Sequence, residues 1–177
     1  VSEMLSIISN NRSKPFSFID AGCGNGWVVR LMKKHSLCHL AIGIDGAVEM
    51  IKKAKTIDPD GIYFCSDLLK WIPEQKVDLI HSMEVFYYLK HPSELIRHMA
   101  LNCLKPGGEM IMGVDFYLEN KKSHSWPVDL NTHMSLFSEH DWVTMFKTNG
   151  FNQVQSFRVN VNNEFPGTLV VRGKLKN

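Results

Sequence analysis

The chain is organised around one stretch, Phe18-Ile19-Asp20-Ala21-Gly22-Cys23-Gly24-Asn25-Gly26-Trp27. An apolar run ends in an acid, and glycines follow at alternate positions. The run predicts a buried strand, and residues 27–34, with Val28, Leu31 and Met32 on one side, predict a helix. Glycine has no Cβ and tolerates positive φ, so such a turn brings bare backbone close to a ligand. The stretch therefore predicts a ligand site between a strand and a helix.

Length and composition restrict the class of protein. A chain of 177 residues suits one domain, and we expect residues 1–177 to form one. The formal charge of +2 gives no strong electrostatic case for a nucleic-acid or anionic-membrane partner. The four cysteines form no C-x-x-C pair and no signal peptide or membrane-length apolar run is evident, so we expect a cytoplasmic protein. Val1 is not a start methionine, which fits a trimmed chain or a lost N-terminal segment.

Strand and helix patterns alternate over residues 1–115. Such alternation predicts right-handed βαβ units and a parallel sheet with helices on both faces. The expected strands are 16–20, 40–44, 62–65, 77–82 and 109–114, and the expected helices are 2–10, 27–34, 46–55 and 92–104, with a helical turn at 68–71.

The pattern changes after Asp115. Residues 116–137 are polar and aromatic with little periodicity, and a loop of this length in a compact domain is usually functional or mobile. Ser138 and Asp141 predict a capped helix that ends at Asn149. Residues 151–161 and 165–172 then predict two strands at the sheet edge.

Acids follow the first strands of the predicted sheet. Asp20, Asp45 and Asp67 each end an apolar run, and Ser82-Met83-Glu84 ends the fourth. One such acid alone is more often a helix cap. Several in succession beside a glycine turn predict a crevice lined by carboxylates, since ligands bind beyond the carboxyl ends of the strands in an open α/β sheet.

Five motifs follow one another along the chain: Asp20-x-Gly22-x-Gly24-x-Gly26, Gly43-Ile44-Asp45, Ser66-Asp67, Val77-Asp78-Leu79-Ile80 and Leu104-Lys105-Pro106-Gly107-Gly108. Their order and spacing resemble class I S-adenosylmethionine-dependent methyltransferases, in particular the small-molecule branch that includes ubiquinone-biosynthesis-like enzymes. The resemblance covers about residues 15–115. It implies a Rossmann-like, doubly wound α/β fold with a mostly parallel seven-stranded sheet, strand order 3-2-1-4-5-7-6 and an antiparallel last strand.

The resemblance implies a role for each motif in binding S-adenosylmethionine. Asp20 would lie near the methionine ammonium group, and Asp45 would accept hydrogen bonds from both ribose hydroxyls. Asp67 would accept from the adenine amino group while the Leu68 N–H donates to the ring. Met50 or Leu68 would cover the adenine face, although both residue types are more often plain core. The further residues implied are Gly22, Cys23 (a turn filler rather than a nucleophile), Gly24, Asn25, Gly26, Gly46, Ser66, and Ser82 with Met83 near the sulfonium.

A dinucleotide oxidoreductase is the rival interpretation, since it also uses a glycine turn and an acid after the second strand. Its usual spacing is G-x-G-x-x-G, and here Trp27 stands where the last glycine belongs. Asp20 would repel a pyrophosphate and attract an ammonium group. Both residues favour S-adenosylmethionine over NAD.

Methyl transfer from a sulfonium is an in-line displacement that depends on positioning, and it needs a base only when the acceptor carries a proton of high pKa. His124 and Tyr117 are the candidate catalytic residues, although a lone loop histidine is more often a surface residue. Tyr87 and Tyr88 either wall an acceptor pocket or pack under the next helix. The segment 116–137 is the candidate acceptor lid, with Phe116, Trp126 and Phe137 as its aromatic residues or as core.

Several acceptor classes are disfavoured. After the fourth strand, Ser82-Met83-Glu84-Val85 contains neither the Asn/Asp-Pro-Pro-Tyr/Phe motif of exocyclic-amine methylation nor the Pro-Cys of cytosine methylation. No residues have metal-ligand spacing, so we expect no metal. A small-molecule acceptor remains, with no nucleic acid and no membrane expected. The alternatives are a protein methyltransferase and a partner subunit that binds the cofactor without catalysis.

Overall fold

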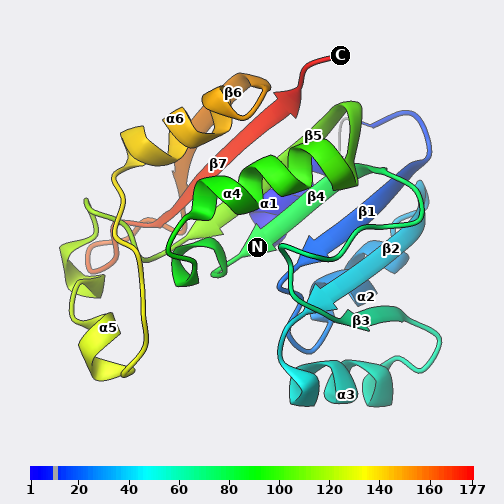
Figure 1. Cartoon of the computed structure of the whole chain (residues 1–177), viewed down its shortest axis with the longest axis horizontal. Coiled ribbons are helices and arrows are strands. Elements are labelled where there is room, and N and C mark those ends of the chain that lie inside the picture. The colour runs from blue at the N-terminus through cyan, green and yellow to red at the C-terminus, as the bar shows by residue number, and fades with distance from the viewer. Residues whose placement is uncertain (10–11) are drawn as a thin grey trace.

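A seven-stranded sheet runs through the computed structural model, which describes residues 1–9 and 12–177 (Figure 1). The strand order is β3-β2-β1-β4-β5-β7-β6, and β7 runs antiparallel to both of its neighbours. The fold implied by the resemblance is therefore confirmed. The strands are β1 (Phe16–Ala21), β2 (Cys38–Asp45), β3 (Ile62–Cys65), β4 (Val77–Met83), β5 (Leu104–Val114), β6 (Phe151–Val159) and β7 (Thr168–Leu175).

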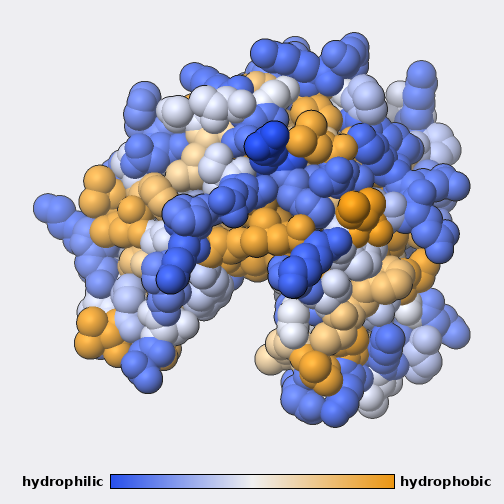
Figure 2. All heavy atoms as spheres, viewed as in Figure 1, coloured by the Kyte–Doolittle hydropathy of each residue, from blue (hydrophilic) through white to orange (hydrophobic). Residues whose placement is uncertain are grey.

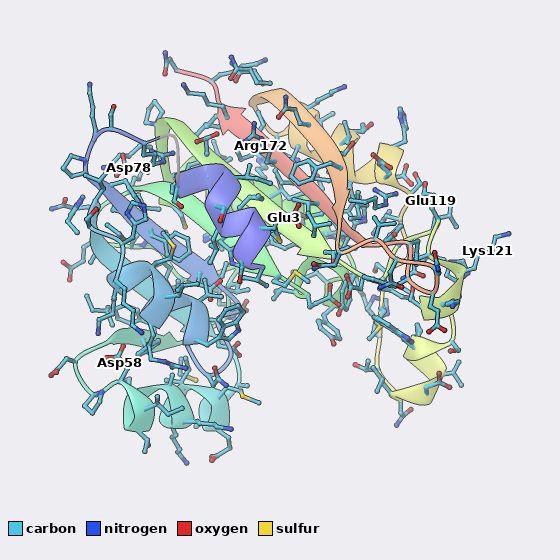
Figure 3. All side chains as sticks on the ribbon, turned by 180° about the vertical axis from the view of Figure 1, so that it is seen from behind. Glu3, Asp58, Asp78, Glu119, Lys121 and Arg172 are labelled. Atoms are coloured by element: carbon cyan, nitrogen blue, oxygen red, sulfur yellow. The ribbon has the colours of Figure 1, made fainter. Side chains whose placement is uncertain are left out.

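Helices cover both faces of the sheet. The α1, α2 and α3 side chains pack with one face in one core cluster, and Figure 3 shows α1 and α2 in front of the sheet from behind. The α4 and α6 side chains pack on the opposite face in the other cluster. The expected end of the first helix at Asn10-Asn11 lies outside the described residues. The helices are α1 (Ser2–Ser9), α2 (Trp27–Lys33), α3 (Val48–Ile57), α4 (Pro92–His98), α5 (Trp126–Asp129) and α6 (Glu139–Thr148).

The buried faces of α2 and α3 differ from the apolar sets predicted from the sequence, which are Val28, Leu31 and Met32 in α2 and Val48, Met50 and Ile51 in α3. Leu31 is exposed, and Val29 is buried in its place. In α3 the buried residues are Ile51 and Ala54, whereas Met50 is 46% exposed. Met50 is exposed because the start of α3 lies at the rim of the sheet, beside the carboxyl ends of the strands (Figure 1).

The helix after Pro92 ends earlier and differently than its apolar pattern predicts. The α-helix α4 gives way to a π-helical segment, Met99–Cys103, and β5 begins at Leu104. The pairing of β4 with β5 is irregular there, since Val77 pairs with Leu104 and Leu79 with Glu109. The motif Lys105-Pro106-Gly107-Gly108 therefore forms a bulge within β5.

The C-terminal elements follow the prediction with shifted ends. Asp141 N–H donates to Ser138 Oγ, and Ser138 N–H donates to the Asp141 carboxylate, so the predicted cap of α6 is confirmed as a capping box. The strands β6 and β7 pair antiparallel, and Asn162 Oδ1 accepts the N–H groups of Glu164 and Phe165 in the turn between them.

Two segments leave the sheet partly open. The connection 66–76 between β3 and β4, all of it described, contains no helix. Ile72 within it and Ile62 and Phe64 of β3 are exposed. At the carboxyl ends of the strands, residues 115–137 with α5 form one wall of a notch and α3 forms the other (Figures 1 and 2). Among the described residues, no helix is long and apolar enough to cross a membrane.

Candidate functional site

The glycine turn has the backbone geometry that its sequence predicts. Gly22, Gly24 and Gly26 have φ angles of +79°, +52° and +75°, in the region that side chains other than glycine rarely adopt. A Cβ on Gly22 would overlap the Val85 side chain, and one on Gly26 would overlap the Tyr63 ring. A Cβ on Gly24 would meet no described atom within 4 Å. The outer two glycines therefore pack inward, and the middle one faces open space.

A cavity of about 300 Å³ lies beside this turn. It is bounded by the turn itself, the start of α2, the exposed side of α3, the end of β4 and Val1. The sequence-predicted residues among its lining are thus brought together from four elements. They are Asp20, Gly22, Cys23, Gly24, Asn25, Met50 and Met83, and Trp27, Val28 and His81 join them.

Asp45 lies at the end of β2, with its carboxylate held at the glycine turn. Asp45 Oδ2 accepts the Gly24 N–H at 2.8 Å, and Oδ1 accepts the Ala47 N–H at 2.8 Å. An ionised carboxylate has about four acceptor positions, so each oxygen keeps one position for a ligand hydroxyl. The side chain is therefore oriented by the backbone and still able to bind a diol.

Asp20 and His81 form a buried pair at the opposite part of the cavity. They are neighbours in the pairing of β1 with β4, and Asp20 Oδ1 lies 2.7 Å from His81 Nδ1. His81 Nε2 has no hydrogen-bond partner among the described residues. His81 was not among the site residues predicted from the sequence. The signal was a histidine directly after the apolar pair Leu79-Ile80, in a strand that the expected strand order places beside β1.

Met50 and Cys23 both line the cavity. Met50 is half exposed and lines the cavity, so it is available to a ligand rather than being plain core. Burial raises the pKa of the Cys23 thiol, and the charges of Asp20 and Asp45 raise it further. Cys23 therefore stays a protonated filler of the turn.

Other predicted cofactor residues lie outside the lining of this cavity. The Ser82 hydroxyl is fully buried and donates to the Ala21 carbonyl at 2.7 Å, so it joins β4 to β1. Asp67 is exposed, and its Oδ1 accepts the Leu69 N–H. Leu68 is half buried against the core. The remaining ones are Gly26, Asp45, Gly46 and Ser66, of which Ser66 donates its N–H to the Asp45 carbonyl.

Asp78 of the fourth-strand motif has a structural position. Its carboxylate accepts the Ser17 N–H and hydroxyl and pairs with Lys105 at 2.8 Å. Figure 3 shows Asp78 at the end of the sheet away from the notch. Asp78 therefore ties β1 to β4 and β5 and does not contribute to the cavity.

The two candidate catalytic residues differ in exposure, since Tyr117 is buried and His124 is exposed. Tyr117 is fully buried, its hydroxyl donates to the Gly167 carbonyl at 2.7 Å, and burial raises its pKa. His124 is exposed, and its Nε2 lies 3.0 Å from the Leu118 carbonyl oxygen. Neither residue is among those lining the two cavities at the notch in the described chain.

A second cavity, of about 360 Å³, lies between α5 and the 3₁₀ turn Phe86–Tyr88. Its lining includes no lysine or arginine among the described residues. Tyr87 packs on Tyr88 with ring centroids 4.5 Å apart, while Phe116 is buried as core. The lining residues are Tyr87, Tyr88, Trp126, Asp129, Leu130 and Met134.

Glu84 lies between the two cavities along the chain. It has a φ of +59°, which is costly for a residue with a Cβ. Its carboxylate accepts the Tyr87 hydroxyl at 2.8 Å and the Asp115 N–H at 2.6 Å. Burial, followed by the charge of Asp115, raises the pKa of Glu84 to about 7. Burial also raises the pKa of Tyr87, which keeps its hydroxyl protonated.

The described residues contain no group of three or more histidine, cysteine or acidic side chains that could hold a metal ion. The strand order, the glycine turn and the oriented acid after β2 together define an α/β protein with a nucleoside-type ligand site. Residues 2–156 match the family described as a methyltransferase domain, and the chain belongs to that family.

Enzymes named as methyltransferases are similar in sequence to parts of the chain. Trans-aconitate 2-methyltransferase of Escherichia coli O1:K1 / APEC is 32% identical over 101 residues, which is 56% of this chain and 40% of the relative. The enzyme of that name from Azoarcus sp. (strain BH72) is 31% identical over 90 residues, which is 51% of this chain and 35% of the relative. The chain thus spans about 40% of the length of the relatives it matches.

Solved structures share the fold. A chain in the complex between the Haloferax volcanii Trm112 methyltransferase activator and the putative methyltransferase superposes with a TM-score of 0.82 at 22% identity, covering 98% of this chain and 89% of that one. The N-methyltransferase NodS from Bradyrhizobium japonicum WM9, in complex with S-adenosyl-L-homocysteine, gives a TM-score of 0.74 at 18% identity, covering 99% and 85%.

Proposed function

We propose that this chain transfers a methyl group from S-adenosylmethionine to a small molecule by in-line displacement. The observation that carries the proposal is the cavity at the glycine turn, where Asp20 is part of the lining and the Gly24 N–H holds the Asp45 carboxylate beside it. Membership of the methyltransferase domain family supports it. Free cysteines and the absence of a membrane-length helix in the described residues are compatible with a cytoplasmic enzyme, which we also propose.

The cofactor is placed by its chemistry. The ribose hydroxyls bind Asp45, Met50 covers the adenine face, and the methionine end extends toward Asp20. Asp67 contacts the adenine amino group from the rim of the site. NAD fits less well, because Trp27 lines the cavity and Asp20 would repel a pyrophosphate.

The acceptor binds in the second cavity under the lid formed by residues 116–137. Met83 lines the first cavity and Tyr87 the second, so the short connection between them joins donor and acceptor. Trans-aconitate is a polycarboxylate, and within the described chain no lysine or arginine lines this cavity to bind one. We therefore propose an uncharged or cationic acceptor with an apolar body that packs on Tyr88 and Trp126.

For an acceptor that carries a proton, Glu84 is a candidate base alongside His124 and Tyr117. Glu84 has a pKa of about 7, raised by burial, and lies between the two cavities along the chain. A carboxyl group that titrates near neutral pH matches the requirement for general base catalysis.

The test combines cofactor binding with turnover. S-adenosylmethionine and S-adenosylhomocysteine should both stabilise the folded chain, by about 2.7 kcal/mol at a ligand concentration of 100 times the dissociation constant. Each should therefore raise the melting temperature. Methyl-labelled cofactor should label a small product from a panel of amines and phenols, and Trp126→Ala should reduce that labelling while leaving S-adenosylhomocysteine binding intact. Stabilisation by NAD but by neither nucleoside would overturn the proposal.

The alternatives give different outcomes in the same experiment. Label that appears in a protein rather than in a small molecule indicates a protein methyltransferase. Cofactor binding with no labelled product from any acceptor indicates a partner subunit that binds the cofactor without catalysis.

The Haloferax structure favours a protein partner. That methyltransferase chain is described in complex with its activator, Trm112. We propose that an activator of this kind binds here at the edge strand β3, where Ile62 and Phe64 are exposed beside a groove of about 700 Å³. Co-purification with such a protein, lost in Phe64→Asp, is the expected result, and retained binding in that variant would exclude this face.

A further inference from the structure

The second cavity has an aromatic corner. Tyr87 and Tyr88 line it with rings whose centroids are 4.5 Å apart and whose planes are tilted by 52°, so the two rings meet at an angle. Trp126 lines the cavity from α5. Phe116 is buried and supports these rings, because its centroid lies 5.7 Å from that of Tyr87 and 6.4 Å from that of Trp126. Three aromatic side chains from two segments therefore line one cavity.

Hydrogen bonds hold the two segments together around this cavity. The Ser135 N–H donates to the Tyr87 carbonyl at 2.8 Å, and the Ser135 hydroxyl donates to the Leu89 carbonyl at 2.8 Å. The Tyr87 hydroxyl donates to the Glu84 carboxylate at 2.8 Å, which fixes the orientation of its ring. A site whose walls are held before a ligand arrives loses less entropy on binding.

The only charge in the described lining is negative. Asp129 is the charged residue there, and within the described chain no lysine, arginine or histidine is part of the lining. The faces of aromatic rings also carry negative partial charge. Such a lining attracts a cation and repels an anion.

We propose that the acceptor binds in this cavity as a cationic amine, with its ammonium group against the rings of Tyr87, Tyr88 and Trp126 and its charge balanced by Asp129. This inference rests on the proposed function, and it narrows the acceptor from an uncharged or cationic molecule to an amine. A phenol has no cation to place on the ring faces, and Asp129 repels its anionic form.

The same lining suits the reaction of an amine. The ammonium first loses a proton to water, which reaches the cavity past the exposed Tyr88 and Leu130. The nitrogen lone pair of the free amine then forms the bond to the methyl carbon while the bond between that carbon and sulfur breaks, and the sulfur keeps the electron pair. The positive charge thus moves from the sulfonium to the nitrogen, where the ring faces stabilise it as it develops.

The first measurement compares choline with 3,3-dimethylbutan-1-ol, which has the same shape without the charge. Calorimetry in the presence of S-adenosylhomocysteine gives both dissociation constants. A cation on an aromatic face gains about 2- to 30-fold in affinity, so we expect the wild type to bind choline at least about fivefold more tightly than the alcohol. Equal affinity for the two probes, or no binding of choline, would overturn the inference.

Trp126→Leu and Trp126→Phe form a matched pair of variants. Leucine keeps an apolar side chain without a ring face, so the preference for choline should fall at least about threefold while affinity for the alcohol changes by less than about twofold. Phenylalanine keeps a ring and should retain most of the preference. Asp129→Asn removes the charge at nearly the same size and should weaken choline alone. An equal loss of both probes in Trp126→Leu, or an unchanged preference in Trp126→Leu and Asp129→Asn, would show that these side chains are structural.

The second measurement is turnover of methyl-labelled S-adenosylmethionine with N-methylphenethylamine and with 4-ethylphenol. We expect the label in the amine. Label that enters the phenol at an equal or higher rate would overturn the inference and leave the proposed function intact. Wild-type protein that does not bind S-adenosylhomocysteine would instead overturn the proposed function.

Discussion

Alanine at Gly24 separates strain in the glycine turn from obstruction of the cavity. Gly24 has a φ of +52°, so any L side chain there is strained by about 1–2 kcal/mol. A Cβ at this position meets no described atom within 4 Å, so no packing cost is added. At Gly22 the strain is the same in kind, and the Cβ also overlaps Val85, which adds about 1–3 kcal/mol of overpacking.

The two variants should therefore differ in which quantity changes most: nucleoside affinity in Gly24→Ala and stability in Gly22→Ala. Gly24→Ala loses about 1–2 kcal/mol of stability. Its added methyl group enters the cavity that we propose for the nucleoside. An overlap of about 1–3 kcal/mol in the bound state weakens S-adenosylhomocysteine by about 5- to 150-fold. Gly22→Ala loses about 2–5 kcal/mol of stability, the sum of strain and overpacking.

Urea unfolding and calorimetry with S-adenosylhomocysteine measure the two quantities. The control is the double variant Gly22→Ala/Val85→Ala, which removes the overlap and keeps the strain. A coupling of about 1–3 kcal/mol between the two substitutions is expected in the double-mutant cycle. The reasoning is refuted if Gly24→Ala destabilises as much as Gly22→Ala, or if it binds the nucleoside as tightly as wild type.

Three further outcomes are expected. Asp45→Ala removes the carboxylate that accepts the Gly24 and Ala47 N–H groups, and S-adenosylhomocysteine should then no longer raise the melting temperature. A shift as large as that of the wild type would contradict the ribose assignment. Glu84 has a folded-state pKa of about 7, raised from 4.5 by burial, so the folded protein keeps the proton longer. Stability should then fall by roughly 1–3 kcal/mol as pH rises through that window, and Glu84→Gln should flatten the fall in urea unfolding. Ser138→Ala removes the capping hydroxyl of α6 and should cost about 1 kcal/mol of stability with unchanged nucleoside affinity.

Much of the fold could be predicted because its signals are local. The alternation of strands and helices, the glycine turn and the Ser138–Asp141 cap each depend on residues close together in the chain. The strand order came from the resemblance of the motifs, and the pairing confirms it. Apolar periodicity was less informative at Leu31 and Met50, because a residue on the apolar side of a helix at the rim of a sheet has no partner to bury it.

The candidate site was predictable only where one segment builds it. The glycine turn and Asp45 are specified by short motifs, and the Gly24 N–H of the turn that lines the cavity donates to the Asp45 carboxylate. Ser82 and Tyr117 fit the same motif and loop positions, but their hydroxyls donate to the carbonyls of Ala21 and Gly167. Which hydroxyl faces a cavity depends on segments distant in sequence, and no local pattern carries that information.

The sequence by itself determined the order of the elements, the positions of the glycine turn and the acid after β2. The tertiary structure alone decided that Asp20 and His81 share a hydrogen bond, that Tyr87 and Trp126 line one cavity, and that burial raises the pKa of Glu84. The physical reason is the separation of the partners. Asp20 and His81 are 61 residues apart, and only the parallel pairing of β1 with β4 makes them neighbours.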